Sequence, residues 1–155
     1  MRKPLIRRIK SEAGFTIFEV LVAALIIGVL AAITTPSFSQ AVSAHRLTAG
    51  LRKSVGAIRV ARSAAISRNV QARVTVSDDG KTLSVEANRP AVGWTVVGVP
   101  VVLEGGVSVT NVAPANGLLF SGQGTVANSV TVTIQNARGD SRQLQVSLLG
   151  GVDIV

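Results

Sequence analysis

Glu19 has the most unusual setting of any residue in this sequence, because it places a carboxylate inside the apolar segment of residues 15–33. Residues 15–33 number 19, and only Thr16 and Glu19 among them have polar side chains. As a helix, this segment would be about 28 Å long, close to the hydrocarbon thickness of a bilayer. A carboxylate at that depth costs on the order of 2.5–3.5 kcal/mol, so a function is expected for it. Taken alone, Glu19 also fits a plain signal anchor whose glutamate reaches the membrane interface.

A short basic leader precedes the apolar segment. Residues 1–14 contain five basic side chains and one acidic side chain, Glu12, so they supply +4 of the formal net charge of +8. By the positive-inside rule, this end stays in the cytoplasm and the rest of the chain is exported. A secretory signal has its small-residue cleavage site after the apolar core, whereas here Gly14 lies before it. Cleavage after Gly14 would remove the leader and leave Phe15 as the new N-terminus.

Such cleavage would give Glu19 a cationic partner. It creates an α-ammonium group at Phe15, and a carboxylate four residues along lies one helical turn away on the same face. Two opposite charges in an apolar medium are tolerable when they meet and costly when they are separated. Pairing within one chain would neutralise both groups, and pairing between chains would also set the axial register of neighbouring subunits.

The order of these residues resembles the N-terminal signature of type IV pilins and type II secretion pseudopilins. The motif is a glycine, a phenylalanine and a glutamate ahead of an apolar run: Gly14-Phe15-Thr16-Ile17-Phe18-Glu19, with Pro36 downstream. The resemblance implies leader cleavage between Gly14 and Phe15 by a prepilin peptidase, followed by N-methylation of Phe15. It also implies that Glu19 pairs with the terminal amine of a neighbouring subunit. Phe18 is a mild departure, since an aliphatic residue is commoner there.

Helical periodicity continues beyond the apolar segment. Pro36 is expected to kink the helix or to end its lipid-embedded half. An apolar stripe at spacings of three and four then predicts a helix that runs to about residue 68: Leu47, Leu51, Val55, Ile58, Ala61 and Ala65. Gly50 and Gly56 each lower the helix propensity by about 1 kcal/mol, which makes local bending plausible.

After Asn69, apolar residues recur at every second position, which predicts β-strands. Residues 71–77 alternate, and Asp78-Asp79-Gly80 is typical of a hairpin turn into residues 82–87. Further strands are expected at residues 95–97, 100–103, 107–112, 118–120, 129–135 and 142–148. The expected fold class is therefore α+β, a long N-terminal helix with a hydrophobic first half and an amphipathic second half, packed on a C-terminal antiparallel β-sheet domain.

This pattern predicts four segments. Residues 1–14 form a leader that is removed, and residues 15–35 form a transmembrane and assembly helix. Residues 36–69 form an amphipathic helix that continues into the domain, and residues 70–155 form a periplasmic, β-rich domain.

Two further segments resemble a subgroup of this family. Residues 60–69 and 142–147 resemble the helix end and the last strand of H-type minor pseudopilins and FimT-like minor pilins. The FimT-like pilins implicated in DNA uptake carry a Gly-Arg-x-Arg motif near the C-terminus. The matching positions here read Gly150-Gly151-Val152-Asp153, so both arginines are missing and a DNA-receptor role is put in doubt.

A run of basic residues keeps an anion or DNA contact under consideration. No acidic residue occurs between Val20 and Ser77, and seven basic residues do. Arg52, Lys53 and Arg59 are the candidates for contact with a phosphate backbone or with anionic headgroups. The favoured interpretation is a solvated helix face that contacts acidic neighbours in a filament, because the cations are spread around the helix.

Enzymatic function is not expected. His45 is the only histidine and has no carboxylate nearby in sequence, and there is no cysteine. No catalytic residue, cofactor site or metal site is predicted. Asp78-Asp79 with Gly80 is more typical of a turn, and a calcium site there is the alternative interpretation.

The sequence favours a minor pseudopilin, a structural subunit of the type II secretion pseudopilus that helps export folded proteins across the outer membrane. The alternative is a FimT-like type IV minor pilin that serves pilus assembly or DNA uptake. The expected partners are a prepilin peptidase, other pilins or pseudopilins through the N-terminal helix, and the inner membrane; nucleic acid is the less favoured partner. The chain is expected to cross the inner membrane once, with its N-terminus cytoplasmic and its C-terminal domain periplasmic. A third possibility, a lone membrane-anchored binding domain, predicts no cleavage at Gly14.

Overall fold

The computed structural model describes residues 14–114 and 117–155, with the side chains of residues 33–37 outside the description. Apart from Gly14, the leader expected at residues 1–14 lies outside the described residues. The chain divides into two compact units between Phe38 and Ser39.

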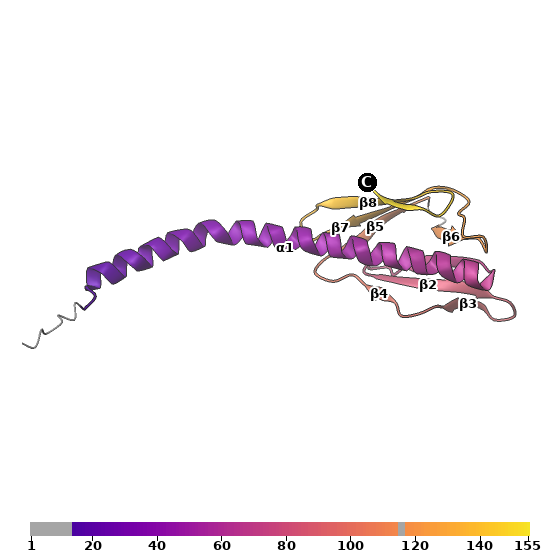
Figure 1. Ribbon diagram of the computed structural model, residues 1–155, viewed down its shortest axis with the longest axis horizontal. Helices are drawn as coiled ribbons and strands as arrows, with labels where there is room; N and C mark the ends of the chain where they lie inside the picture. Colours follow the sequence, from indigo (N-terminus) through magenta and orange to yellow (C-terminus); the bar gives the residue numbers. More distant parts are fainter. Residues whose placement is uncertain (1–13, 115–116) are drawn as a thin grey trace, which may run out of the picture. The chain divides into compact units, whose positions relative to one another are not determined.

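One helix, α1 (Ile17–Arg68), accounts for all the helical structure of the described residues (Figure 1). Its 52 residues confirm the long helix expected from the periodicity. The helix does not end at Pro36, and the kink expected there stays a prediction. It ends where Asn69 takes a left-handed φ of 49° and its amide N–H donates to the Ile66 carbonyl at 3.2 Å, a common way to close a helix.

The strands form two antiparallel sheets. The first has the order β3-β2-β1-β6, with β4 also paired to β2, and the second has the order β5-β7-β8-β9. The strands are β1 (Ala72–Val76), β2 (Thr82–Arg89), β3 (Gly93–Val96), β4 (Val101–Val102), β5 (Ser108–Ala113), β6 (Leu118–Phe120), β7 (Val130–Gln135), β8 (Ser141–Val146) and β9 (Val152–Ile154). The antiparallel β-domain is confirmed. The division into two sheets and the last strand, β9, were not expected from the sequence.

The core of the second unit lies where the helix and both sheets meet. In Figure 1, the C-terminal half of α1 runs along the domain, with β2, β3 and β4 on one side and β5, β7 and β8 on the other. Along β7, buried and half-buried residues alternate, as expected for a strand with one face on a core. The largest fully buried side chains come from all three layers: Ile58 of α1, Leu83 and Phe120 of the first sheet, and Ile134 and Leu144 of the second.

Small residues on the buried face of α1 allow this close packing. Gly50 is buried, and a Cβ atom added to it would lie 2.8 Å from Cγ1 of Val107. Ser54 is also buried and donates its hydroxyl to the Gly50 carbonyl at 3.0 Å. Gly50 therefore marks a close approach of the helix to the β-domain.

The hairpin between β1 and β2 turns through Asp78, Asp79 and Gly80, as the sequence predicts. The Ser77 hydroxyl and the main-chain N–H of Lys81 donate to the Asp79 carboxylate, and these hydrogen bonds hold the pKa of Asp79 below its ordinary value. Within residues 14–114 and 117–155, no three His, Cys, Asp or Glu side chains gather as metal ligands would.

Arg62 joins α1 to two turns that are far from it in sequence. Its Nε donates to the Gly124 carbonyl and its Nη1 donates to the Gly150 carbonyl, each at 3.1 Å. Gly150 has a φ of +75°, and an added Cβ would lie 2.4 Å from the Gly124 carbonyl oxygen. The two turns also meet directly, because the Val126 N–H donates to the Leu148 carbonyl at 3.0 Å. Arg62 thereby fastens the crossover between the sheets and the β8–β9 turn to the helix.

Gly50→Ala is expected to destabilise the protein. Overpacking against Val107 costs about 1–3 kcal/mol, which exceeds the gain of about 1 kcal/mol in helix propensity. Gly56→Ala is the matched control, since an added Cβ there meets nothing within 4 Å. It should raise the free energy of unfolding by up to about 1 kcal/mol. Denaturant unfolding followed by the fluorescence of Trp94, the only tryptophan, measures both. Equal effects of the two substitutions would contradict the close approach at Gly50.

Arg62→Met is expected to lower the free energy of unfolding by about 1–3 kcal/mol, because two partly buried carbonyls lose their donors. Arg59→Met serves as the control, since Arg59 is exposed and makes no hydrogen bond or ion pair among the described residues. The free energy of unfolding of Arg59→Met should stay within about 0.5 kcal/mol of that of the wild type. The same unfolding measurement applies, and a difference below about 0.5 kcal/mol between the variants would show that the two bonds contribute little.

Candidate functional site

The residues of the N-terminal motif lie at the start of α1. Gly14, Phe15 and Thr16 precede the helix and have no regular secondary structure, and Glu19 lies in the first helical turn. The Thr16 hydroxyl accepts a hydrogen bond from the main-chain N–H of Glu19 at 3.2 Å, and the Thr16 carbonyl accepts one from the N–H of Val20 at 3.2 Å. Thr16 is therefore the N-cap residue of α1.

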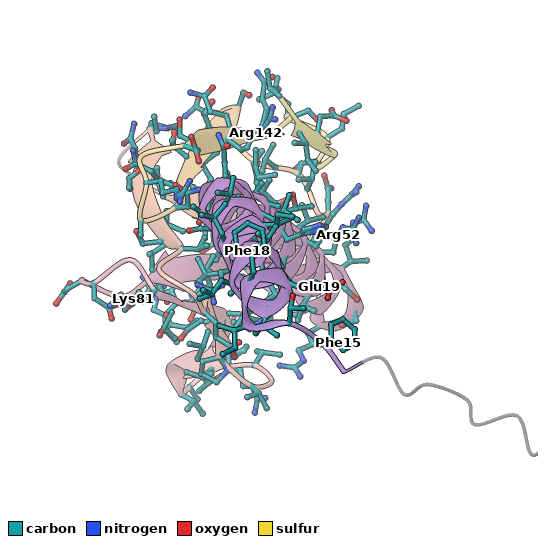
Figure 2. The ribbon with its side chains drawn as sticks, turned by 90° about the vertical axis from the view of Figure 1, so that its left-hand side faces the viewer. Phe15, Phe18, Glu19, Arg52, Lys81 and Arg142 are labelled. Carbon is teal, nitrogen blue, oxygen red and sulfur yellow. The ribbon has the colours of Figure 1, made fainter. Side chains whose placement is uncertain are left out.

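Phe15 and Glu19 are both available for contacts outside the chain. The Phe15 side chain is 82% exposed, and Glu19 is also exposed. Figure 2 views the helix from its N-terminal end and shows Phe15 and Glu19 on one side of the helix start. Among the described residues, no cation lies within ion-pairing distance of the Glu19 carboxylate. Its negative charge is favourable in the first turn, where the helix dipole is positive.

The first part of α1 is apolar all round and exposed within a single chain. The large apolar side chains between Ile17 and Leu30 keep between 41% and 82% of their surface exposed. A helix with this composition needs cover from other helices or from lipid. Among the described residues, no helix combines the length and the apolar character needed to cross a membrane.

The three cations proposed for anion contact do not act as one group. The Lys53 ammonium donates to the Val102 carbonyl at 3.0 Å and lies 3.7 Å from the Glu104 carboxylate, which offsets its charge. Arg52 and Arg59 are exposed on α1. Arg59 lines a shallow hollow on the helix surface together with Arg62, Ser63, Ile66 and Ser67. Of the three candidates, Arg52 and Arg59 keep their charges without an ion pair among the described residues.

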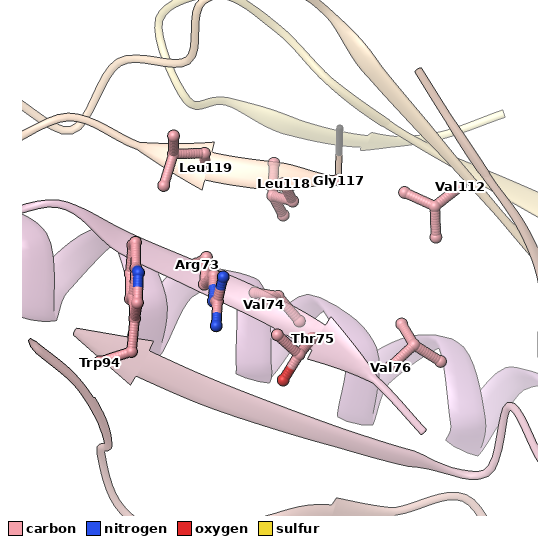
Figure 3. Close-up of a pocket in the computed structure, with 9 residues that line it drawn as sticks. All are labelled: Arg73, Val74, Thr75, Val76, Trp94, Val112, Gly117, Leu118 and Leu119. Carbon is pink, nitrogen blue, oxygen red and sulfur yellow. The ribbon is translucent and has the colours of Figure 1, made fainter. Parts of the chain in front are cut away.

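A second surface feature was missed by the sequence analysis. On the first sheet, Nε of Arg73 donates to the Glu86 carboxylate at 2.7 Å, and the guanidinium lies 4.2 Å from the centre of the Trp94 ring. Figure 3 shows Arg73 and Trp94 beside Leu119, at one end of a hollow that continues along β1. Only the strand register brings these residues together, because Arg73 pairs with Glu86 and with Leu119 in neighbouring strands. The alternation of residues 71–77 was the only signal in the sequence.

Comparisons with known proteins agree with this geometry. Residues 51–150 match the family model of the type II transport protein GspH, and residues 9–35 match the prokaryotic N-terminal methylation motif. No curated protein matches the chain significantly.

Solved structures with the same fold include a pseudopilin and a pilin. The minor pseudopilin EpsH from the type 2 secretion system of Vibrio cholerae is 14% identical, with a TM-score of 0.58; the match covers 71% of this chain and 96% of that chain. The type IV minor pilin FimU of Pseudomonas aeruginosa is 19% identical, with a TM-score of 0.60; the match covers 72% of this chain and 89% of that chain. These likenesses confirm the pilin-like α+β fold. Since the GspH model spans most of the β-domain and the helix segment that packs on it, the chain belongs to the type II transport protein GspH family.

Proposed function

We propose that this protein is a minor pseudopilin, a structural subunit of a type II secretion pseudopilus that helps export folded proteins across the outer membrane. The GspH match over residues 51–150 is the observation that carries the proposal. The methylation motif at residues 9–35 supports it independently, because it covers a separate part of the chain.

The proposed mechanism begins at the N-terminal motif. A prepilin peptidase removes the leader between Gly14 and Phe15, and Phe15 is then N-methylated. The new α-ammonium group and the exposed Glu19 carboxylate need partners once apolar surroundings replace water. Pairing between the Glu19 carboxylate of one subunit and the terminal amine of the next satisfies both and sets their axial register. The exposed apolar surface of residues 17–30 is covered at the same time by neighbouring helices and by lipid.

This mechanism assigns a location and a set of partners. We propose that the N-terminal helix anchors the protein once in the inner membrane, with the leader on the cytoplasmic side and the β-domain in the periplasm. The proposal rests on the methylation motif at residues 9–35, since no helix of the described residues qualifies as a membrane span by itself. Other pilins or pseudopilins bind through the helix. Pro36, within α1, is proposed to kink it near the membrane surface.

A FimT-like type IV minor pilin is the second candidate, favoured by the structural likeness to FimU. DNA contact in that role would rely on Arg52 and Arg59, since Gly151 and Asp153 stand where the Gly-Arg-x-Arg motif has arginines. Lys53 contributes less, because Glu104 is its neighbour.

Glu19→Val is expected to leave membrane insertion intact and to reduce incorporation into filaments by at least about tenfold. The variant leaves a buried ammonium group unpaired, which costs about 3–5 kcal/mol, and each 1.4 kcal/mol corresponds to about tenfold. Incorporation is measured by recovering the protein with purified filaments. Phe18→Leu, which changes the adjacent residue without removing a charge, is the control and should assemble normally. Normal assembly of Glu19→Val would show that the carboxylate is dispensable.

Deletion of the gene in its host distinguishes a role in the type II secretion pseudopilus from a role in a type IV pilus. A pseudopilin role predicts that folded enzymes accumulate in the periplasm while surface pili persist, because only the secretion filament lacks a subunit. A wild-type copy should restore export, and the Glu19→Val copy should not. Normal export together with a loss of pili or of DNA uptake would favour the FimT-like pilin.

A further inference from the structure

Thr16 determines where α1 begins relative to the bond that the peptidase must cut. Its carbonyl accepts the first helical hydrogen bond, from Val20, and its hydroxyl accepts one from the N–H of Glu19. An N-cap residue itself keeps a non-helical backbone, so the chain on its N-terminal side is held out of the helix. The helix therefore begins at Ile17.

The Gly14–Phe15 peptide bond consequently lies outside the helix. Gly14 and Phe15 have no regular structure and are exposed, and a Cβ built on Gly14 would meet nothing within 4 Å. A peptide bond inside a helix has its N–H and C=O engaged in main-chain hydrogen bonds and is enclosed by side chains. Among residues 14–114 and 117–155, nothing imposes either constraint on the bond between Gly14 and Phe15, so an enzyme can approach it from several sides.

We infer that Thr16 is a positioning residue for leader cleavage: its hydroxyl fixes the helix start just beyond the scissile bond and so holds that bond at a constant position relative to the helix. The inference rests on the proposed function, because it concerns cleavage by a prepilin peptidase. It adds a role for a residue that contributes no charge and undergoes no chemistry. Without the hydroxyl, the first turn has no side-chain acceptor for the N–H of Glu19 and frays, so the distance from the helix to the scissile bond is no longer constant.

The same hydrogen bond also affects Glu19. Thr16 and Glu19 have the spacing of a capping box, in which the glutamate side chain can return to the N–H of the cap residue. Among the contacts of the described residues, the Glu19 carboxylate does not make that return bond. Thr16 therefore fixes the Glu19 backbone in the first turn while the carboxylate stays available for a partner.

The test compares substitutions of Thr16 that keep or remove a side-chain acceptor. The full chain is co-expressed with a prepilin peptidase, and the cleaved fraction is followed over time. Thr16→Ser and Thr16→Asn keep an acceptor at the cap and should be cleaved at rates close to wild type. Thr16→Val has nearly the shape of threonine but no acceptor, and cleavage should slow by about five- to tenfold, the equivalent of a typical cap contribution.

A second threonine of α1 supplies the matched control. Thr48 lies in the middle of the helix, where its hydroxyl donates to the Ala44 carbonyl at 3.0 Å. Thr48→Val makes the same chemical change far from the scissile bond and should leave the cleavage rate unchanged. Hydrogen exchange of the Glu19 amide in the uncleaved chain should be faster in Thr16→Val than in Thr16→Ser.

The outcomes separate the role of Thr16 from the proposed function on which it rests. Cleavage of Thr16→Val at the wild-type rate would overturn the inference and leave the proposed function intact. Slow cleavage of Thr16→Asn with normal cleavage of Thr16→Val would also overturn it, since the enzyme would then be reading side-chain shape. A wild-type chain that keeps its leader in the presence of the peptidase would count against the proposed function itself.

Discussion

The domain depends on the close packing of one narrow face of α1 against two β-sheets. That face contains small residues: Gly50, Ser54, Ala57, Ala61, Ala64 and Ala65 are all buried. Because these side chains are short, the helix main chain can approach the sheets closely, and larger side chains from the strands fill the remaining space. Leu83, Phe120 and Ile134 are nearly or completely buried in that space. Buried residues from both sheets belong to one core cluster, to which the helix contributes from Leu47 to Ala65.

Much of this fold could be predicted from local patterns in the sequence. The apolar stripe of α1 and the alternation in β1, β2 and β7 are repeated often enough to identify a helix and strands. The division into two sheets depends instead on pairings between distant strands, such as β1 with β6 and β5 with β7. β9 has three residues, too few to show a period. Gly50 has a low helix propensity, so the sequence alone predicts that it weakens the helix. The packing against Val107 nevertheless requires a residue without a side chain at this position.

The candidate site was predictable to the extent that its residues are contiguous. Gly14, Phe15 and Glu19 form one short motif, and their chemistry follows from their order and from the apolar run behind them. The capping role of Thr16 also follows from neighbours in sequence. Contacts across the domain cannot be predicted from neighbouring residues, because the two carbonyls bound by Arg62 are 62 and 88 residues away in sequence. The cluster of Arg73, Glu86 and Trp94 likewise exists only in the final strand register.

The two hydrogen bonds that Arg62 donates to separate turns have a consequence for how relatives of this protein can diverge. The guanidinium occupies the space beside both turns, and an added Cβ at Gly124 or Gly150 would approach it within 3.2 Å. A substitution at any one of the three positions therefore disturbs the other two. We expect these positions to covary among homologues, with arginine and both glycines inherited together or exchanged together, even though they lie in three separate parts of the chain.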